Sequence, residues 1–403
     1  MKRAVNIIAY TALILTFFIS PCAAQKNHPY KKDKGLLQTI DKNFKDATDQ
    51  YKLLAKNLPP DKFPKTFFPA TQQYEFSNSG WWCSGFYPGS LLYLYEQTKD
   101  PALLGEAERM LKILENEKNN TGTHDLGFMM YCSFGNADRI ASRPGYKDIL
   151  LTSARSLSTR FNPRVGCIRS WDSRSNEYLV IIDNMMNLEL LFWATRVTGD
   201  SSFYKIAVTH ANTTIKNHFR SDYSSYHVLN YDQETGEVKQ KRTAQGAADS
   251  SAWARGQSWG LYGFTVMYRE TRDIKYLEQA KHIAHFLLTH PNLPADKIPY
   301  WDFNAPGIPN VLRDASAASI MAAALLELSS YVDEKSSNDY IKTAEIILKS
   351  LSSANYKAKA GTNGGFILQH GVGNMPGKTE IDVPLTYGDY YFIEAMIRYK
   401  NLH

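Results

Sequence analysis

Two aspartates each begin a helical run in connections that are rich in aromatic and polar residues. Asp125 follows His124 in NNTGTHDLGF, and Asp183 stands in IIDNMMNLELLFWAT. If the fold brings the two carboxylates together, both cannot ionise cheaply, and one keeps its proton near neutral pH. A protonated acid beside an ionised one is what cleavage of a glycosidic bond requires. The alternative is that each aspartate caps the helix that it begins, since Asp is a favoured N-cap residue.

The sequence DSSAWARGQSWG, residues 249–260, places a cation beside an indole. Arg255 and Trp259 are four residues apart and share one face of a helix. A guanidinium can hold a carboxylate, and an indole can stack on a sugar ring. A buried arginine that pairs with a structural acid among core tryptophans fits the same spacing.

Four copies of one local pattern indicate what positions these residues. In each copy an apolar helical run ends on Thr-x-Asp, or a near equivalent, and a second amphipathic run begins. The copies end at Asp100, Asp200, Asp273 and, in degenerate form, Asp333. Helix pairs repeated along a chain indicate a solenoid or a closed helical toroid.

Hydrophobic period and stop signals predict about twelve helical segments. Their ranges are near 36–57, 86–98, 101–117, 126–139, 145–160, 184–198, 202–218, 248–271, 274–289, 315–332, 338–353 and 384–400. Short strands are expected at 226–231, 237–242 and 365–369. Six antiparallel pairs predict an all-α (α/α)6 barrel in a single domain; an open α-solenoid is the structural alternative. The Thr-x-Asp turns should lie on one rim, and the long aromatic-rich connections on the opposite, functional rim.

The N-terminal sequence MKRAVNIIAYTALILTFFISPCAAQ has the form of a secretory signal, which predicts a signal peptide over 1–24 and an exported, periplasmic protein. A lipoprotein cut before Cys22 is the alternative. Residues 25–35 are Lys-rich and expected to be flexible, and 36–403 should form the catalytic domain. No later segment is apolar enough to span a bilayer.

Composition excludes several other classes. Loss of Lys2 and Arg3 with the signal leaves 46 − 2 = 44 basic and 40 acidic residues, a net charge of +4, with no basic run dense enough for nucleic acid. Three cysteines then remain, without C-x-x-C spacing or an H-E-x-x-H motif, so neither a structural nor a catalytic zinc site is expected. The 25 Tyr and 7 Trp suit either sugar binding or a large helical core.

Several separated motifs together resemble one known family. The segments WWCSGFYPGSLLYLYEQT, THDLGFMM, IIDNMMNLELLFWA, AADSSAWARGQSWGLYGF, DASAASIMAAALLEL and DVPLTYGDYYFIEAMIRY occur in the order found in the unsaturated glucuronyl hydrolases, family 88 of the glycoside hydrolases. The resemblance covers nearly the whole mature chain. It implies an (α/α)6 barrel that releases a 4,5-unsaturated uronic acid from lyase-generated oligosaccharides by hydration of a vinyl ether, without metal or cofactor.

The resemblance also assigns roles to individual residues. Asp183 matches the general acid and base, and Asp125 matches the second essential carboxylate, which acts either as a nucleophile or as a group that tunes its partner and binds the sugar. The positions that match substrate-contacting residues are Gln245, Arg255, Trp259, His227, Trp171, Trp82, His124, Thr243 and His370.

Three other functions fit parts of the same pattern. Unsaturated rhamnogalacturonyl hydrolases share the barrel and the reaction but act on pectin fragments. A non-catalytic glycan-binding protein would keep the aromatic residues without needing two facing acids. A sugar epimerase on the same barrel would use histidines as acid and base, where this sequence offers carboxylates.

Overall fold

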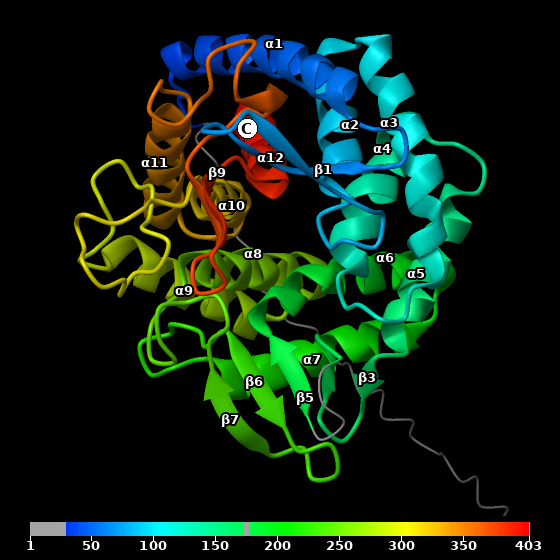
Figure 1. The fold of residues 1–403 in the computed structure, drawn as a ribbon. Helices are drawn as coiled ribbons and strands as arrows, with labels where there is room; N and C mark the ends of the chain where they lie inside the picture. Colours follow the sequence, from blue (N-terminus) through cyan, green and yellow to red (C-terminus); the bar gives the residue numbers. More distant parts are fainter. Residues whose placement is uncertain (1–29, 173–176, 403) are drawn as a thin grey trace, which may run out of the picture.

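In the computed structural model, which describes residues 30–172 and 177–402, helices alternate between an inner and an outer ring (Figure 1). The inner elements are α2 (Phe86–Thr98), η2 (Gly127–Gly135) with α4 (Asn136–Ala141), α6 (Leu188–Thr198), α8 (Ala254–Thr271), α10 (Ala315–Leu328) and α12 (Thr386–Lys400). The outer helices are α1 (Lys34–Asn57), α3 (Pro101–Leu114), α5 (Tyr146–Ser158), α7 (Ser201–His218), α9 (Ile274–Thr289) and α11 (Glu334–Leu351). Because α12 packs on both α10 and α2, the ring is closed, and the predicted (α/α)6 barrel is confirmed.

The two rings differ in how their helices are buried. Helix α10, ASAASIMAAALLEL, is buried on nearly every side, and its small residues let its neighbours approach closely. Helix α3 is amphipathic and buries only one stripe, which includes Leu103, Ala107 and Met110. An inner helix such as α10 is covered on nearly every side, whereas an outer helix such as α3 needs only one apolar face.

The Thr-x-Asp turns join inner helices to the outer helices that follow. In each, the aspartate is the N-cap of the outer helix and accepts a backbone N–H, as Asp200 does from Ser202 at 2.8 Å. The residue before it in the three full copies has left-handed backbone, with φ of 59° at Lys99, 75° at Gly199 and 57° at Arg272. This turn reverses the chain in the same way each time, which explains why the pattern recurs.

A network of half-buried charges links the inner helices near the rim at which these turns lie. Arg398 of α12 lies 2.9 Å from Glu327 of α10, and Arg269 of α8 lies 3.0 Å from the same carboxylate. Arg269 also pairs with Glu189 of α6. Charged groups from four inner helices therefore hold one another in place at this end of the barrel.

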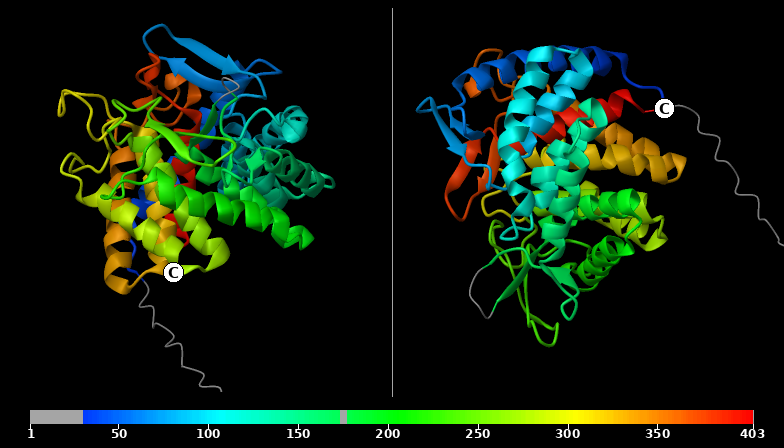
Figure 2. Two further views of the ribbon diagram at one scale, coloured as in Figure 1. Left: turned by 90° about the horizontal axis from the view of Figure 1, so that it is seen from below. Right: turned by 90° about the vertical axis from the view of Figure 1, so that its right-hand side faces the viewer.

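Short strands lie at the opposite rim, and there are more of them than the sequence predicted. They are β1 (Phe63–Phe68) with β2 (Gln73–Ser77), β3 (Phe161–Asn162) with β4 (Cys167–Ile168), the sheet β5 (Tyr178–Ile181), β6 (Val228–Tyr231) and β7 (Val238–Arg242), and β8 (Gly371–Asn374) with β9 (Thr379–Val383). The β1–β2 and β8–β9 hairpins stand together at one end of the barrel, where β1 contacts β9 (Figure 2).

The predicted strands at 226–231 and 237–242 are confirmed as β6 and β7, but the one at 365–369 is wrong. A 3-10 turn, η5 (Asn363–Gly365), precedes this segment. The backbone N–H groups of Ile367 and Leu368 then bind the carboxylate of Asp389 at 2.9 and 2.8 Å. The segment therefore forms only an isolated bridge, between Leu368 and Lys357, because the carboxylate of Asp389 takes two of its N–H groups.

Three predicted helices begin differently. The segment at 126–139 is a π-helix, η2, followed by α4, and α6 is preceded by a 3-10 turn, η3 (Ile182–Asn187). The predicted helix from 248 begins only at Ala254. Further 3-10 turns are η1 (Glu115–Asn119) and η4 (Ser329–Tyr331). The π-helix η2 follows Asp125, and the 3-10 turn η3 contains Asp183. Such departures from α-helical geometry are common at functional sites.

The start of the chain is tied down earlier than expected. Helix α1 begins at Lys34 with Asp33 as its N-cap, and the Lys32 ammonium donates to the carbonyls of Lys400 and Leu402. The described part of the predicted flexible segment, from Tyr30, is therefore joined to the C-terminus. The predicted signal peptide (1–24), with Cys22, lies outside the described residues. Among the helices of the described residues, none is both long and apolar enough to cross a bilayer.

Candidate active site

A pocket of about 360 Å³ opens at the rim where the inner helices begin. It is lined by Gly80, Trp81, Trp82, Thr123, His124, Asp125, Trp171, Ile181, Asp183, Ala244, Gln245, Arg255 and Asn374. Seven predicted site residues are in this set: six come from four connections between the predicted helices, and Arg255 comes from α8. The rim opposite the Thr-x-Asp turns is thus the one that gathers them, as predicted.

Asp125 and Asp183 line the same pocket because η2, which follows Asp125, is in contact with η3, which contains Asp183. Asn187 of η3 accepts the backbone N–H of Phe128 at 3.0 Å. A Cβ on Gly127 would lie 2.4 Å from the Cα of Asn187, so only glycine permits this approach. The contact fixes the starts of the two elements, and with them Asp125 and Asp183, on the same wall.

Asp183 is the buried acid of the pair, with 8% of its surface exposed. Burial raises the pKa of its carboxyl from 3.8 to about 7; the charge of Arg255 opposes this rise and that of Asp125 adds to it. Its Oδ2 atom has no hydrogen-bond partner among the described residues. The group is therefore poised to hold and give up a proton near neutral pH, as a general acid must.

Asp125 is more accessible, with 14% of its side chain exposed. Its Oδ2 accepts the hydroxyl of Thr123 at 3.0 Å, and its Oδ1 lies 3.3 Å from Nε2 of His124. Neither Asp125 nor Asp183 caps the helix that it begins: the N-cap positions are Leu126 and Ile181, without side-chain bonds. The capping alternative is therefore wrong for both.

His227 lies beside Asp183 as a neutral imidazole and is not hydrogen-bonded to it. Its Nδ1 accepts the backbone N–H groups of Ala244 at 3.2 Å and Gln245 at 3.3 Å, which assigns the proton to Nε2. This Nε2 faces Oδ2 of Asp183 at 3.8 Å, and burial lowers the pKa of the imidazole well below 6.5. His227 is not among the pocket-lining residues, so its place is against the acid.

Arg255 takes the structural role that was the alternative for it, although it also reaches the pocket. Its guanidinium lies 3.2 Å from Asp314, the N-cap of α10, and donates at 2.6 Å to the carbonyls of Val372 and Gly373 in β8. Both side chains of the pair are buried, at 1% and 0% exposure. Its positive charge lowers the pKa of Asp183 and so opposes part of the rise that burial causes.

Replacing Arg255 by Met is expected to destabilise the fold by about 3–5 kcal/mol, because Asp314 is left buried without its partner. Urea unfolding of R255M would measure the loss. In the double variant R255M/D314N the buried charge is gone while Asn still caps α10, so part of the stability should return. Equal stability of the single and double variants would contradict this account.

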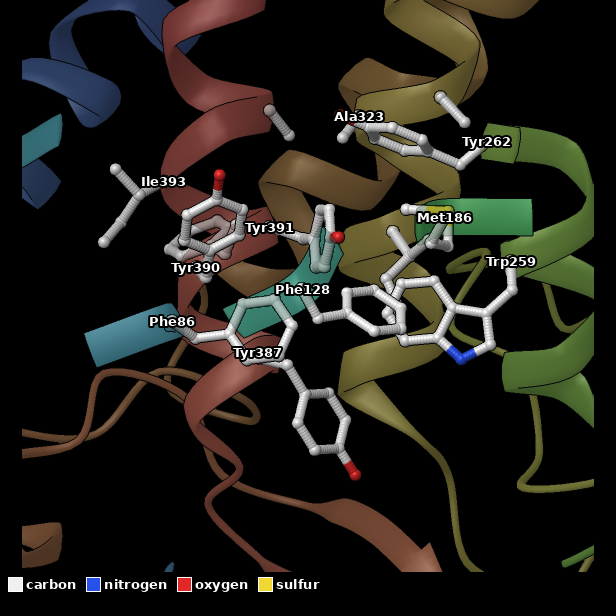
Figure 3. Packing of buried hydrophobic residues seen from close by; sticks show 14 of the residues in the cluster. Phe86, Phe128, Met186, Trp259, Tyr262, Ala323, Tyr387, Tyr390, Tyr391 and Ile393 are labelled. Atoms are coloured by element: carbon white, nitrogen blue, oxygen red, sulfur yellow. The ribbon is translucent and has the colours of Figure 1, made fainter. Parts of the chain in front are cut away.

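Trp259 cannot stack a sugar as expected. It is fully buried, and its ring packs against Phe128 at 5.0 Å and Tyr391 at 5.4 Å between centroids (Figure 3). Its indole N–H lies close enough to Asp183 to lower the pKa of that carboxyl. The residue belongs to the aromatic core beneath the pocket and offers the site its N–H.

The indoles of three tryptophans line the pocket. Trp82 packs at 4.9 Å on Tyr387, and Trp171 is bridged to Leu179 of β5 and lies 5.9 Å from the ring of His227. Trp81 was missed in the sequence, although it adjoins Trp82; it is 38% exposed, and the Lys65 ammonium lies 4.8 Å from its ring centroid. These indoles are the stacking surfaces that the site offers.

The remaining predicted contacts divide between the pocket and its supports. Gln245 lines the pocket and donates to the Gly373 carbonyl at 3.0 Å, which leaves its oxygen for a ligand. Thr243 accepts the N–H of Gly246 at 2.8 Å and does not line the pocket. His370 lies outside the pocket lining, is 43% exposed and pairs with Asp382 at 2.6 Å. Asn374, the last residue of β8, was missed because nothing local marks it.

The two histidines beside the acids of the site are uncharged. Burial also lowers the pKa of His124, so the imidazoles of His124 and His227 stay uncharged beside the acids. Within residues 30–172 and 177–402, no group of three or more His, Cys, Asp or Glu is placed to hold a metal ion. A helical barrel with a protonated carboxyl, a second carboxylate and indole walls defines the class of the protein: a glycoside hydrolase.

Comparison with known proteins identifies the family. Residues 60–298 match the model of Glycosyl Hydrolase Family 88, and the chain belongs to this family. It is 44% identical over 401 residues to the unsaturated glucuronyl hydrolase of Formosa agariphila, covering 98% of both chains.

Solved structures show the same similarity. An unsaturated glucuronyl hydrolase specific for heparin superposes with a TM-score of 0.87 at 47% identity, covering 90% of this chain and 97% of the other. A mutant of the Streptococcus agalactiae enzyme in complex with dGlcA-GalNAc6S gives a TM-score of 0.76 at 29% identity, covering 89% and 90%.

Proposed function

We propose that this enzyme releases 4,5-unsaturated uronic acid from the non-reducing end of lyase-generated oligosaccharides of the glycosaminoglycan type. The observation that carries the proposal is Asp183, a buried acid with a pKa of about 7 that shares a pocket with the charge of Asp125. The names of the relatives, unsaturated glucuronyl and chondroitin disaccharide hydrolases, favour this substrate class over pectin fragments.

The reaction begins with proton transfer to an enol ether. The carboxyl of Asp183 donates its proton to C4, and positive charge develops on C5 and the ring oxygen. Asp125, as an ionised carboxylate in the same pocket, stabilises that charge. Water then adds at C5 while Asp183, now ionised, takes one of its protons and is restored.

The product of this step breaks down without further help from a nucleophile. The hemiketal at C5 opens, which leaves C1 as a hemiacetal of the leaving sugar, and its collapse frees that sugar. The N–H of His227, which faces Asp183 Oδ2, favours the ionised form of the acid after it has given its proton. The indoles of Trp82 and Trp171 hold the rings at the mouth.

A panel of lyase-generated disaccharides tests the proposal. Loss of the ultraviolet absorbance of the conjugated enol ether, with release of the free sugar, should occur with chondroitin or heparin disaccharides and not with a pectic one. Turnover of the pectic disaccharide alone would instead assign the enzyme to the rhamnogalacturonyl group. No turnover of any of them would point to a glycan-binding protein.

We further propose that the protein is exported, in line with the basic, apolar and small-residue order of residues 1–24. Fractionation of cells and N-terminal sequencing of the mature protein would test this. A mature N-terminus at Gln25 would support a signal peptidase cut, and a lipid-modified Cys22 would support the lipoprotein alternative.

A further inference from the structure

The sheet β5–β6–β7 presents a cation on the side that faces the pocket. Residues directly opposite in an antiparallel sheet lie on the same face. Ile181 of β5 is paired with Val228 of β6, and Val228 is paired with Arg242 of β7. Since Ile181 lines the pocket, Arg242 lies on the pocket face of the sheet.

The other cations of β7 are directed elsewhere. Lys241, paired with Leu229, is on the opposite face, where its ammonium lies 4.9 Å from the ring centroid of Tyr226. Lys239 pairs with Asp232 at 2.9 Å. The strand VKQKR therefore gives the pocket face one guanidinium and keeps its lysines away from it.

Arg242 has hydrogen-bonding capacity to spare. Its Nε is buried and has no hydrogen-bond partner among the described residues. Its Nη2 lies 4.0 Å from a Glu177 oxygen, longer than the distance of about 2.8 Å that a charge-assisted hydrogen bond takes. Its side chain is 30% exposed, so an anion from solution can reach it.

We propose that Arg242 binds a sulfate group on the leaving sugar. The inference rests on the proposed function, in which the uronate lies between Asp125 and Asp183 and the next sugar extends to the mouth. Arg242 itself is not among the pocket-lining residues, but Ala244, two residues after it, is part of the pocket wall, so the guanidinium lies on the pocket face of the sheet outside that lining. A planar guanidinium suits an oxyanion, because it donates two parallel hydrogen bonds where an ammonium acts as a point charge.

Two disaccharide pairs test this residue. The first is the unsaturated chondroitin disaccharide with and without a 6-sulfate, and the second is the unsaturated heparin disaccharide with and without a sulfate on the glucosamine. For at least one pair, R242Q should lower kcat/KM of the sulfated member about 10- to 100-fold, mainly through KM, with the unsulfated member within about twofold. The matched control K241Q removes the adjacent charge on the other face and should change each value by no more than about twofold.

The proposal is overturned if R242Q slows the sulfated and unsulfated members equally, or if K241Q has the same effect as R242Q. A wild-type enzyme that prefers the unsulfated member of both pairs would also overturn it. In each of these cases the wild type is active and the proposed function stands. A wild type that cleaves none of the four disaccharides removes the proposed function itself.

Discussion

Asp183→Asn is expected to abolish turnover, with kcat reduced by about 10³- to 10⁴-fold, while the substrate still binds. The amide has nearly the shape of the carboxyl and occupies the same buried place, but it has no proton to give to C4. Because the lost interaction acts only in the transition state, the effect belongs in kcat and not in KM.

The stability of this variant provides a second, independent readout. The pKa of Asp183 is raised from 3.8 in the unfolded chain to about 7 in the fold, so the folded state holds its proton more tightly. The contribution of Asp183 to the free energy of unfolding is therefore largest below pH 4. It falls as pH rises toward 7, since an ionised carboxylate must then stay buried. Asn carries no charge, so above pH 7 the D183N protein should be at least as stable as the wild type.

Single-turnover kinetics would measure the loss of turnover in D183N, and calorimetric titration with an unsaturated disaccharide would measure the binding that it retains. Asp41→Asn, which removes an exposed carboxylate of α1 that pairs with Lys400, is the control and should change neither. Turnover near the wild-type rate in D183N would remove Asp183 from the reaction.

The barrel follows from the sequence because its signals are local. Each Thr-x-Asp turn carries its own capping hydrogen bond, and each outer helix carries its own apolar stripe, so pattern alone gives the number and order of helix pairs. The strands at the rim are different. The segment at Ile367 and Leu368 depends on a distant partner, Asp389, which no local pattern reveals.

The site residues likewise divide into those that the sequence marks and those whose role depends on distant neighbours. The residue type and loop position of Asp125 and Asp183 marked them before their surroundings were known, whereas Trp82 and Gln245 were assigned by the family resemblance. The role of Trp259 could not be predicted in this way, because spacing places a residue on a helix face and cannot say which face another helix covers. Here Phe128 and Tyr391 cover it. Likewise, the proton on Nε2 of His227 is set by two backbone N–H groups from a loop 17 residues away in sequence.

Asp125→Asn should both slow the reaction and move its pH dependence. The expected loss in kcat is about 10²- to 10³-fold, since the charge that stabilises positive character at C5 is removed from the pocket. In the wild type, activity requires protonated Asp183 and should decline as pH rises through about 7.

The direction of the shift in D125N follows from the sign of the interaction. The negative charge of Asp125 raises the pKa of Asp183, so its removal lowers that pKa and moves the alkaline decline of kcat/KM to lower pH. A profile from pH 4 to 9, with Asp41→Asn as the control for loss of a remote carboxylate, measures it. If Asp125 acted only as a nucleophile without charge coupling to Asp183, the residual activity of D125N would decline at the same pH as the wild type. A decline at lower pH would show that Asp125 also sets the pH at which its partner can act as an acid.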